Sequence, residues 1–166
     1  MQSRLTSALF ALVLTSVAGT AVQAQTAPAA RKAAMPTIED TYRDIQATLG
    51  LVPGFFRAYP EQGLPGAWLD FKGVQVAENT RIDPKMKQLI GLAVSAQVPC
   101  GYCVYFHTQV AKAYGATPEE IKEAVALAAI SRHWSTVLNG MAIDMASFKG
   151  EVDASLRIAA ERAAKK

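Results

Sequence analysis

Apolar side chains recur with the period of an α-helix along most of the chain after residue 36. The segment 37–50 places its apolar residues on one helical face, Thr37 suits the N-cap position, and Gly50 ends the pattern. No segment of the sequence alternates between apolar and polar residues with the period of a β-strand, and there is no internal repeat. The pattern therefore predicts an all-α fold in a single domain.

A segment broken by prolines follows this first helix. Three prolines interrupt residues 51–66, which predicts short helical turns and loops there. A longer helix is expected to begin around Trp68 and to run toward Glu78.

The next helix has a well-marked start. Asp83 suits the N-cap and Pro84 the first helical position. The residues 89–98 are apolar nearly all round, which predicts a buried central helix, and Pro99 closes it.

Two further helices are predicted in the C-terminal half. One spans the residues from Cys100 to a stop at Gly115. The other opens with a capping box formed by Thr117 and Glu120, and its pattern allows it to continue as far as residue 148. Residues 151–166 form a weaker amphipathic pattern, which we interpret as a C-terminal helical tail. The helical domain proper is therefore expected to cover residues 37–150.

The first 24 residues have the composition of a secretory signal peptide. A short basic start precedes an uncharged apolar run, and small side chains at positions 22 and 24 favour cleavage after Ala24. An uncleaved membrane anchor is the alternative, but the run contains Ser, Thr and Gly and ends in a good cleavage site. We therefore expect a periplasmic or secreted protein that is not held at the membrane after cleavage. Residues 25–36 are rich in Ala and Pro and predict a flexible spacer.

Composition and charge exclude some classes of function. About half of the 166 residues (51%) are hydrophobic, which suffices for a packed core without disulfides. The formal net charge of +3 is small for this length, so binding to nucleic acid has little electrostatic support.

The chain's only two cysteines lie in the stretch "PCGYCVYFH", residues 99–107. If a helix begins near Cys100, both sulfurs lie in its first turn, where unpaired N–H groups stabilise a thiolate. The spacing brings the sulfurs of Cys100 and Cys103 within reach of a disulfide. His107 lies on the same helical stripe and is placed to take a proton from a thiol. The stretch thus combines a nucleophile, a resolving thiol and a base.

The same stretch has the residues for three other kinds of chemistry to a lesser degree. Zinc would find only three ligands here, and a fourth, such as His133, would be about thirty residues away in sequence. Covalent haem attachment needs a histidine directly after the second cysteine, where Val104 stands. A purely structural disulfide stays open, although so short a loop constrains the unfolded chain little. No cofactor is predicted.

Residues 87–129, with the motif C-x2-C-x3-H followed by "GATPEEI", resemble the core of the alkylhydroperoxidase D / carboxymuconolactone decarboxylase family. The resemblance covers roughly residues 68–148. It implies a helical fold that assembles into trimers or hexamers. It also implies a peroxidase whose cysteine pair, once oxidised to a disulfide, is reduced again by a dithiol partner. On this resemblance Cys103 attacks the peroxide, Cys100 resolves the product into a disulfide, and His107 belongs to the proton relay.

Two positions depart from the family pattern. The family's glutamate, twelve residues before the first cysteine, is Gln88 here, and its second histidine is Tyr102. An amide cannot accept a proton at neutral pH, but Gln88 can orient His107 or a water. Both changes remove acid–base capacity. A thiol–disulfide oxidoreductase with little peroxidase activity, acting on a small disulfide, and a non-enzymatic helical oligomer therefore remain as alternatives.

Residues outside the motif are expected to play lesser parts. Tyr105 and Phe106 are expected to line the pocket or the core beside the cysteines. Arg132 and His133 lie within a helical run; they can either steer a substrate or face a subunit interface or solvent, and we favour the second interpretation.

Overall fold

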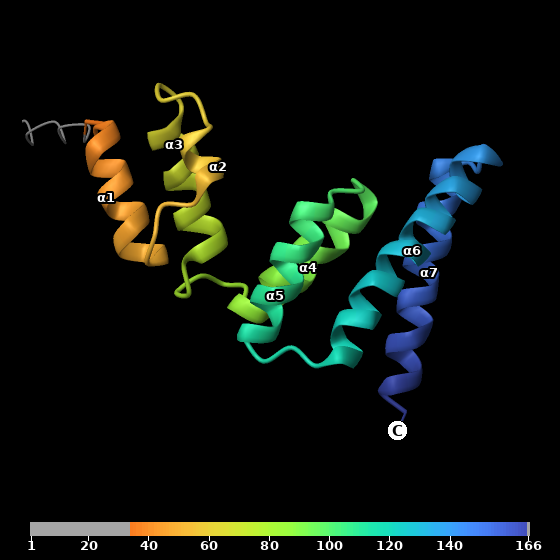
Figure 1. The fold of residues 1–166 in the computed structure, drawn as a ribbon. Coiled ribbons are helices and arrows are strands. Elements are labelled where there is room, and N and C mark those ends of the chain that lie inside the picture. Colours follow the sequence, from red (N-terminus) through yellow and green to blue (C-terminus); the bar gives the residue numbers. More distant parts are fainter. Residues whose placement is uncertain (1–33, 166) are drawn as a thin grey trace, which may run out of the picture. The chain divides into compact units, whose positions relative to one another are not determined.

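The computed structural model describes residues 34–165. The predicted signal peptide and most of the predicted spacer lie outside the described residues. The chain divides into two units, Met1–Ala34 and Met35–Lys166, and all the helices named here belong to the second. No residue from 34 to 165 forms a β-strand, so the prediction of an all-α fold is confirmed (Figure 1). The elements are α1 (Ile38–Leu49), α2 (Gly54–Arg57), α3 (Leu64–Asp70), η1 (Phe71–Val76), α4 (Pro84–Gln97), α5 (Gly101–Ala113), α6 (Pro118–Gly140) and α7 (Met145–Ala163).

The first three helices share one small core. The side chains of Ile45, Phe56, Leu64 and Trp68 are buried against one another. The predicted cap of α1 is confirmed, because the Thr37 side chain accepts a hydrogen bond from the Asp40 N–H. The predicted end of α1 is also confirmed, since Gly50 has a left-handed φ of 81° that favours glycine. As expected from the prolines, α2 and α3 are short.

The helix predicted from Trp68 toward Glu78 has two parts. After α3 the chain continues as η1, a π-helical segment that ends at Val76. The Lys87 Nζ donates hydrogen bonds of 2.6 Å to the carbonyl oxygens of Val74 and Ala77, which ties the end of η1 to α4. This contact sets η1 beside the first turns of α4.

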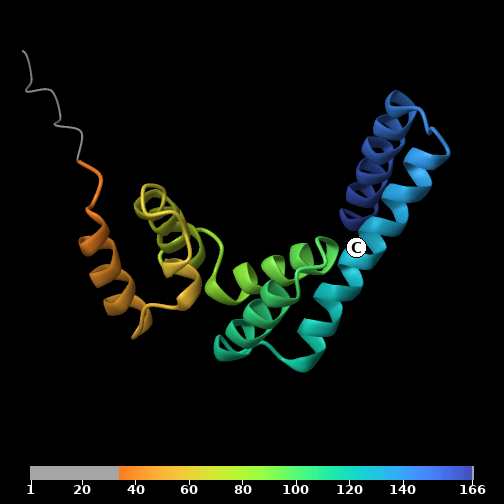
Figure 2. The same ribbon diagram turned by 45° about the horizontal axis from the view of Figure 1, so that its top comes forward.

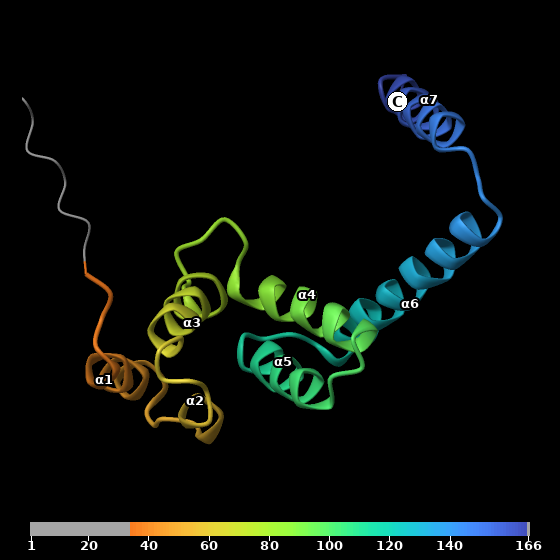
Figure 3. The ribbon, with the colours of Figure 1, turned by 90° about the horizontal axis from the view of Figure 1, so that it is seen from above.

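Helix α4 lies against both α5 and α6 (Figures 2 and 3). Its predicted start is confirmed, with Asp83 as N-cap and Pro84 at the first position. The prediction that residues 89–98 are buried nearly all round is wrong, because Ile90 and Val94 are 46% and 57% exposed. The neighbouring helices α5 and α6 cover only part of the surface of α4. Apolar composition alone does not reveal which side of α4 stays exposed to solvent.

The C-terminal helices differ in extent from the predictions. The capping box of Thr117 and Glu120 opens α6 as predicted, but α6 ends at Gly140 instead of continuing to residue 148. Asp144 caps a new helix, α7, so the tail expected from residue 151 is the C-terminal part of a longer helix. None of the described residues of α7 is buried. Among the helices that the structure describes, none has the length and apolar character needed to cross a membrane.

Candidate functional site

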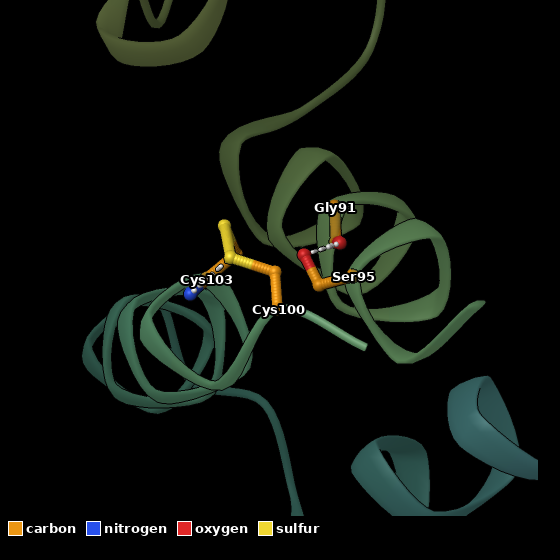
Figure 4. Close-up of a disulfide and its surroundings, with 4 residues drawn as sticks. All are labelled: Gly91, Ser95, Cys100 and Cys103. Atoms are coloured by element: carbon orange, nitrogen blue, oxygen red, sulfur yellow. Dashed lines mark hydrogen bonds between the residues drawn. A yellow bond between two sulfur atoms is a disulfide. The ribbon is translucent and has the colours of Figure 1, made fainter. Parts of the chain in front are cut away.

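The two cysteines form a disulfide at the start of α5 (Figure 4). Their Cα atoms are 5.3 Å apart. Cys100 is the N-cap of α5, with extended backbone angles, and its Sγ accepts a hydrogen bond of 3.2 Å from the Cys103 N–H. Both sulfurs therefore lie in the first helical turn, as the sequence predicted. After reduction, the N–H groups of this turn favour a thiolate at Cys100.

His107, one helical turn after Cys103, contacts a buried glutamine. Its Nδ1 lies 2.9 Å from Oε1 of Gln88, whose side chain is only 1% exposed. The sequence predicted that Gln88 could orient His107, and the structure brings the two together. Burial lowers the pKa of His107 below its ordinary value of 6.5, so the imidazole is neutral at neutral pH.

Gln75, on η1, joins the same group of side chains. Its Nε2 donates a hydrogen bond of 2.9 Å to the same Oε1 of Gln88. Sequence reasoning missed Gln75 because its segment was recognised only as part of a longer helix. No pattern within the segment marks one polar residue over another.

Gly91 makes room for the imidazole. A Cβ at this position would collide with the ring atoms of His107, so only glycine allows the ring to lie directly on the α4 backbone. One turn further along, Ser95 Oγ donates a hydrogen bond of 2.6 Å to the carbonyl oxygen of Gly91 (Figure 4). Sequence reasoning missed Gly91 as well. The available signal was a glycine inside an apolar helix, which commonly marks a close approach.

A pocket of about 390 Å³ opens beside these residues. Cys103 and His107 both line it, whereas Cys100 is not part of its wall. The walls are mainly aromatic, and the lining residues are Phe55, Phe71, Gln75, Tyr102, Cys103, Phe106 and His107. Phe106 lines the pocket as expected. Tyr105 is not among the lining residues and is 70% exposed, so it lies neither in the pocket wall nor in the core.

Tyr102 replaces the family's second histidine on the pocket wall. Its side chain is 93% exposed, so it stands at the rim and offers only a phenol there. A neutral phenol lacks the basic nitrogen of a neutral imidazole, so Tyr102 does not replace the proton acceptor that a histidine would supply.

The other candidate residues of the sequence lie in different contacts. Arg132 Nε donates to Oε1 of Gln97 at 3.0 Å, and the ring of His133 stands edge-on to Trp134 on the exposed surface of α6. Between residues 34 and 165, no three His, Cys, Asp or Glu side chains are grouped as they would need to be to hold a metal ion.

The packing of His107 on Gly91 predicts the effect of a single methyl group. Gly91→Ala is expected to displace the imidazole, to lower the free energy of unfolding by about 1–3 kcal/mol through overpacking, and to slow thiol reactivity. Gly150→Ala, where an added Cβ meets nothing within 4 Å, is the matched control. Urea unfolding and thiol reactivity, measured side by side, check this expectation. Equal stability and equal reactivity of the two variants would contradict it.

Three comparisons with known proteins bear on this site. The model of the carboxymuconolactone decarboxylase family matches residues 62–144. An uncharacterised protein of Cupriavidus necator is 35% identical over 68 residues, which are 40% of this chain. The matched part spans only 60% of that relative's length.

A solved structure extends the comparison to the fold. The crystal structure of the alkylhydroperoxidase AhpD core from Rhodospirillum rubrum matches with a TM-score of 0.57 and 31% sequence identity. The match covers 65% of this chain and 82% of that one. The resemblance inferred from the sequence is thereby confirmed: the chain has an AhpD-like helical fold and belongs to the carboxymuconolactone decarboxylase family.

Proposed function

We propose that the protein is a thiol-dependent peroxidase that reduces organic hydroperoxides with Cys100 and Cys103 as its redox pair. The observation that carries this proposal is the shared pocket, because Cys103 and His107 line the same aromatic cavity. Its apolar walls suit an alkyl or aryl hydroperoxide and limit competition by water. The similarity to the alkylhydroperoxidase core from Rhodospirillum rubrum supports the same class of reaction.

In the reduced protein, Cys103 attacks first. His107 takes the thiol proton, directly or through a water, and the thiolate attacks the terminal oxygen of the hydroperoxide. An S–O bond forms while the O–O bond breaks, so Cys103 becomes a sulfenic acid. The alcohol leaves with the proton that His107 returns. The peroxide gains the two electrons that the sulfur loses.

Cys100 completes the cycle. Its thiol gives up a proton, the thiolate attacks the sulfur of the Cys103 sulfenic acid, and an S–S bond forms while the S–O bond breaks. The hydroxyl takes up that proton and leaves as water. The N–H of Cys103, which points at Cys100 Sγ, favours that thiolate. A dithiol protein or small dithiol then supplies two electrons and two protons and becomes a disulfide itself.

Thiol–disulfide exchange is the second candidate function. Gln88 favours it, because an amide in place of a carboxylate weakens proton transfer to the alcohol that leaves a peroxide. Exchange with a small disulfide depends less on that transfer, since its leaving group is a thiolate. A protein that turns over neither substrate would be a helical oligomer with inactive thiols.

We further propose that the mature protein is exported and forms a homo-oligomer. The signal-peptide pattern of residues 1–24 supports export. Exposed apolar side chains support assembly, since large apolar surfaces commonly mark interfaces. On α6 and α7 they include Leu127, Ile130, Trp134, Met145, Val152, Leu156 and Ile158. Sedimentation of the mature protein is expected to show a trimer or a hexamer.

Serine variants test the assignment of the two sulfurs. Cys103→Ser is expected to consume no peroxide, because the attacking sulfur is gone. Cys100→Ser is the matched control: it still reacts once, stopping at the sulfenic acid, which a dimedone-type trap captures. Consumption of cumene hydroperoxide, followed by a peroxide dye, distinguishes them. Peroxide turnover by Cys103→Ser would rule out the assigned nucleophile.

Replacing Gln88 by the glutamate of the family pattern tests the proton relay through His107. Gln88→Glu places a negative charge against Nδ1 of His107, which raises the pKa of the imidazole and makes it a stronger base. We expect faster reaction with peroxide above neutral pH, by up to roughly 10²-fold. We also expect the acid limb of the rate to lie at higher pH than in the wild type, where burial lowers the pKa of His107 and keeps the ring neutral further into acid.

The matched control for this charge change is Gln97→Glu, on the same helix but bonded to α6 instead of His107. Stopped-flow tryptophan fluorescence over a range of pH measures both variants. If Gln88→Glu and Gln97→Glu give the same rates and the same pH profile, Gln88 has no part in the relay.

A further inference from the structure

The π-helical segment η1 brings one polar side chain to the pocket. Gln75 lies on η1, lines the pocket together with Cys103 and His107, and is partly buried. π-Helical turns occur often at functional sites, where they redirect a side chain that a regular helix would aim elsewhere. Gln75 touches neither sulfur in the described contacts, and its hydrogen bond is to the buried Gln88.

The hydrogen bond between Gln75 and Gln88 determines which atoms donate and which accept along the chain from Gln75 through Gln88 to His107. Gln75 Nε2 can only donate, so the Gln88 atom that faces it must be the carbonyl oxygen. The same oxygen lies 2.9 Å from Nδ1 of His107 and accepts there with its second lone pair. Nδ1 therefore carries the proton. In a neutral imidazole the other nitrogen is then an acceptor, so Nε2 is free to take a proton.

We propose that Gln75 is a positioning residue: by donating to Gln88, it holds the Gln88 oxygen against His107 Nδ1 and leaves Nε2 as the proton-accepting nitrogen. Rotation of the Gln88 amide would place its NH₂ group against the NH₂ of Gln75, two donors without an acceptor. Because Gln88 is buried, an unpaired group there is costly.

The arrangement also suits the step after proton uptake. When Nε2 gains a proton, Nδ1–H still donates to the Gln88 oxygen, so no side chain has to move. The glutamine pair thus orients the imidazole without a carboxylate. The catalytic meaning of this inference rests on the proposed peroxidase function, but the tautomer of His107 is a property of the oxidised protein and is tested without any turnover.

Side-chain ¹⁵N NMR of the oxidised protein measures the tautomer directly, at a pH well above the ordinary imidazole pKa of about 6.5. We expect wild-type His107 to be the Nδ1–H form, whereas a free imidazole in water prefers Nε2–H. Gln75→Met, which cannot donate, is expected to shift His107 toward Nε2–H. Gln97→Met is the matched control, since it also removes glutamine hydrogen bonds from α4, and should leave the tautomer unchanged.

A second variant keeps the test decisive if Gln75→Met folds poorly. Gln75→Glu has the same shape but can only accept, so it favours rotation of the Gln88 amide and the same shift toward Nε2–H. In the reduced protein, either variant should react with cumene hydroperoxide roughly tenfold more slowly, less than the 10²–10⁴ expected for loss of a general base.

Two results would overturn the proposal: an Nε2–H tautomer in the wild type, or an unchanged Nδ1–H tautomer in both Gln75 variants. A correct tautomer in a protein that does not react with peroxide would leave the positioning role intact and would count against the peroxidase function alone.

Discussion

The site depends on the burial of one amide, that of Gln88, at the meeting point of η1, α4 and α5. A buried polar group destabilises the fold unless it is hydrogen-bonded. Gln88 meets this condition with one partner from each neighbouring segment, Gln75 and His107. The same two bonds that compensate its burial therefore also fix the position of the imidazole.

The position of His107 also depends on the close packing of α4 against α5. Gly91 lets the imidazole of His107 lie against the α4 backbone, which places the first turn of α5 beside the aromatic pocket. That turn carries the disulfide, with Cys103 on the pocket wall. The two sulfurs are placed differently: Cys103 lies on the pocket wall, whereas Cys100 caps the helix beside its N–H groups.

Local features of the site could be predicted from the sequence, because short-range patterns determine them. The caps at Thr37, Asp83 and Thr117 depend on residues within one turn, as does the placement of both cysteines at a helix start. The prediction that Gln88 orients His107 came from the family pattern and agrees with their contact. Their catalytic roles stay predictions.

Features that depend on tertiary packing could not be predicted. Gln75 meets Gln88 across the loop between η1 and α4, and no local pattern encodes that meeting. The exposure of Ile90 and Val94 depends on which side of α4 its neighbours cover, which apolar composition does not reveal. The helical pattern of α6 continues past Gly140, so it does not reveal that Asp144 caps a new helix.

The most direct test of the account is a thiol count. Reduced mature protein is mixed with a stoichiometric amount of cumene hydroperoxide, and free thiols are measured over time. A thiol peroxidase loses both thiols of each chain rapidly, with the Cys100–Cys103 disulfide as the product. Thiols that persist, while the same protein rapidly exchanges with a small disulfide, would contradict the peroxidase function and favour thiol–disulfide exchange.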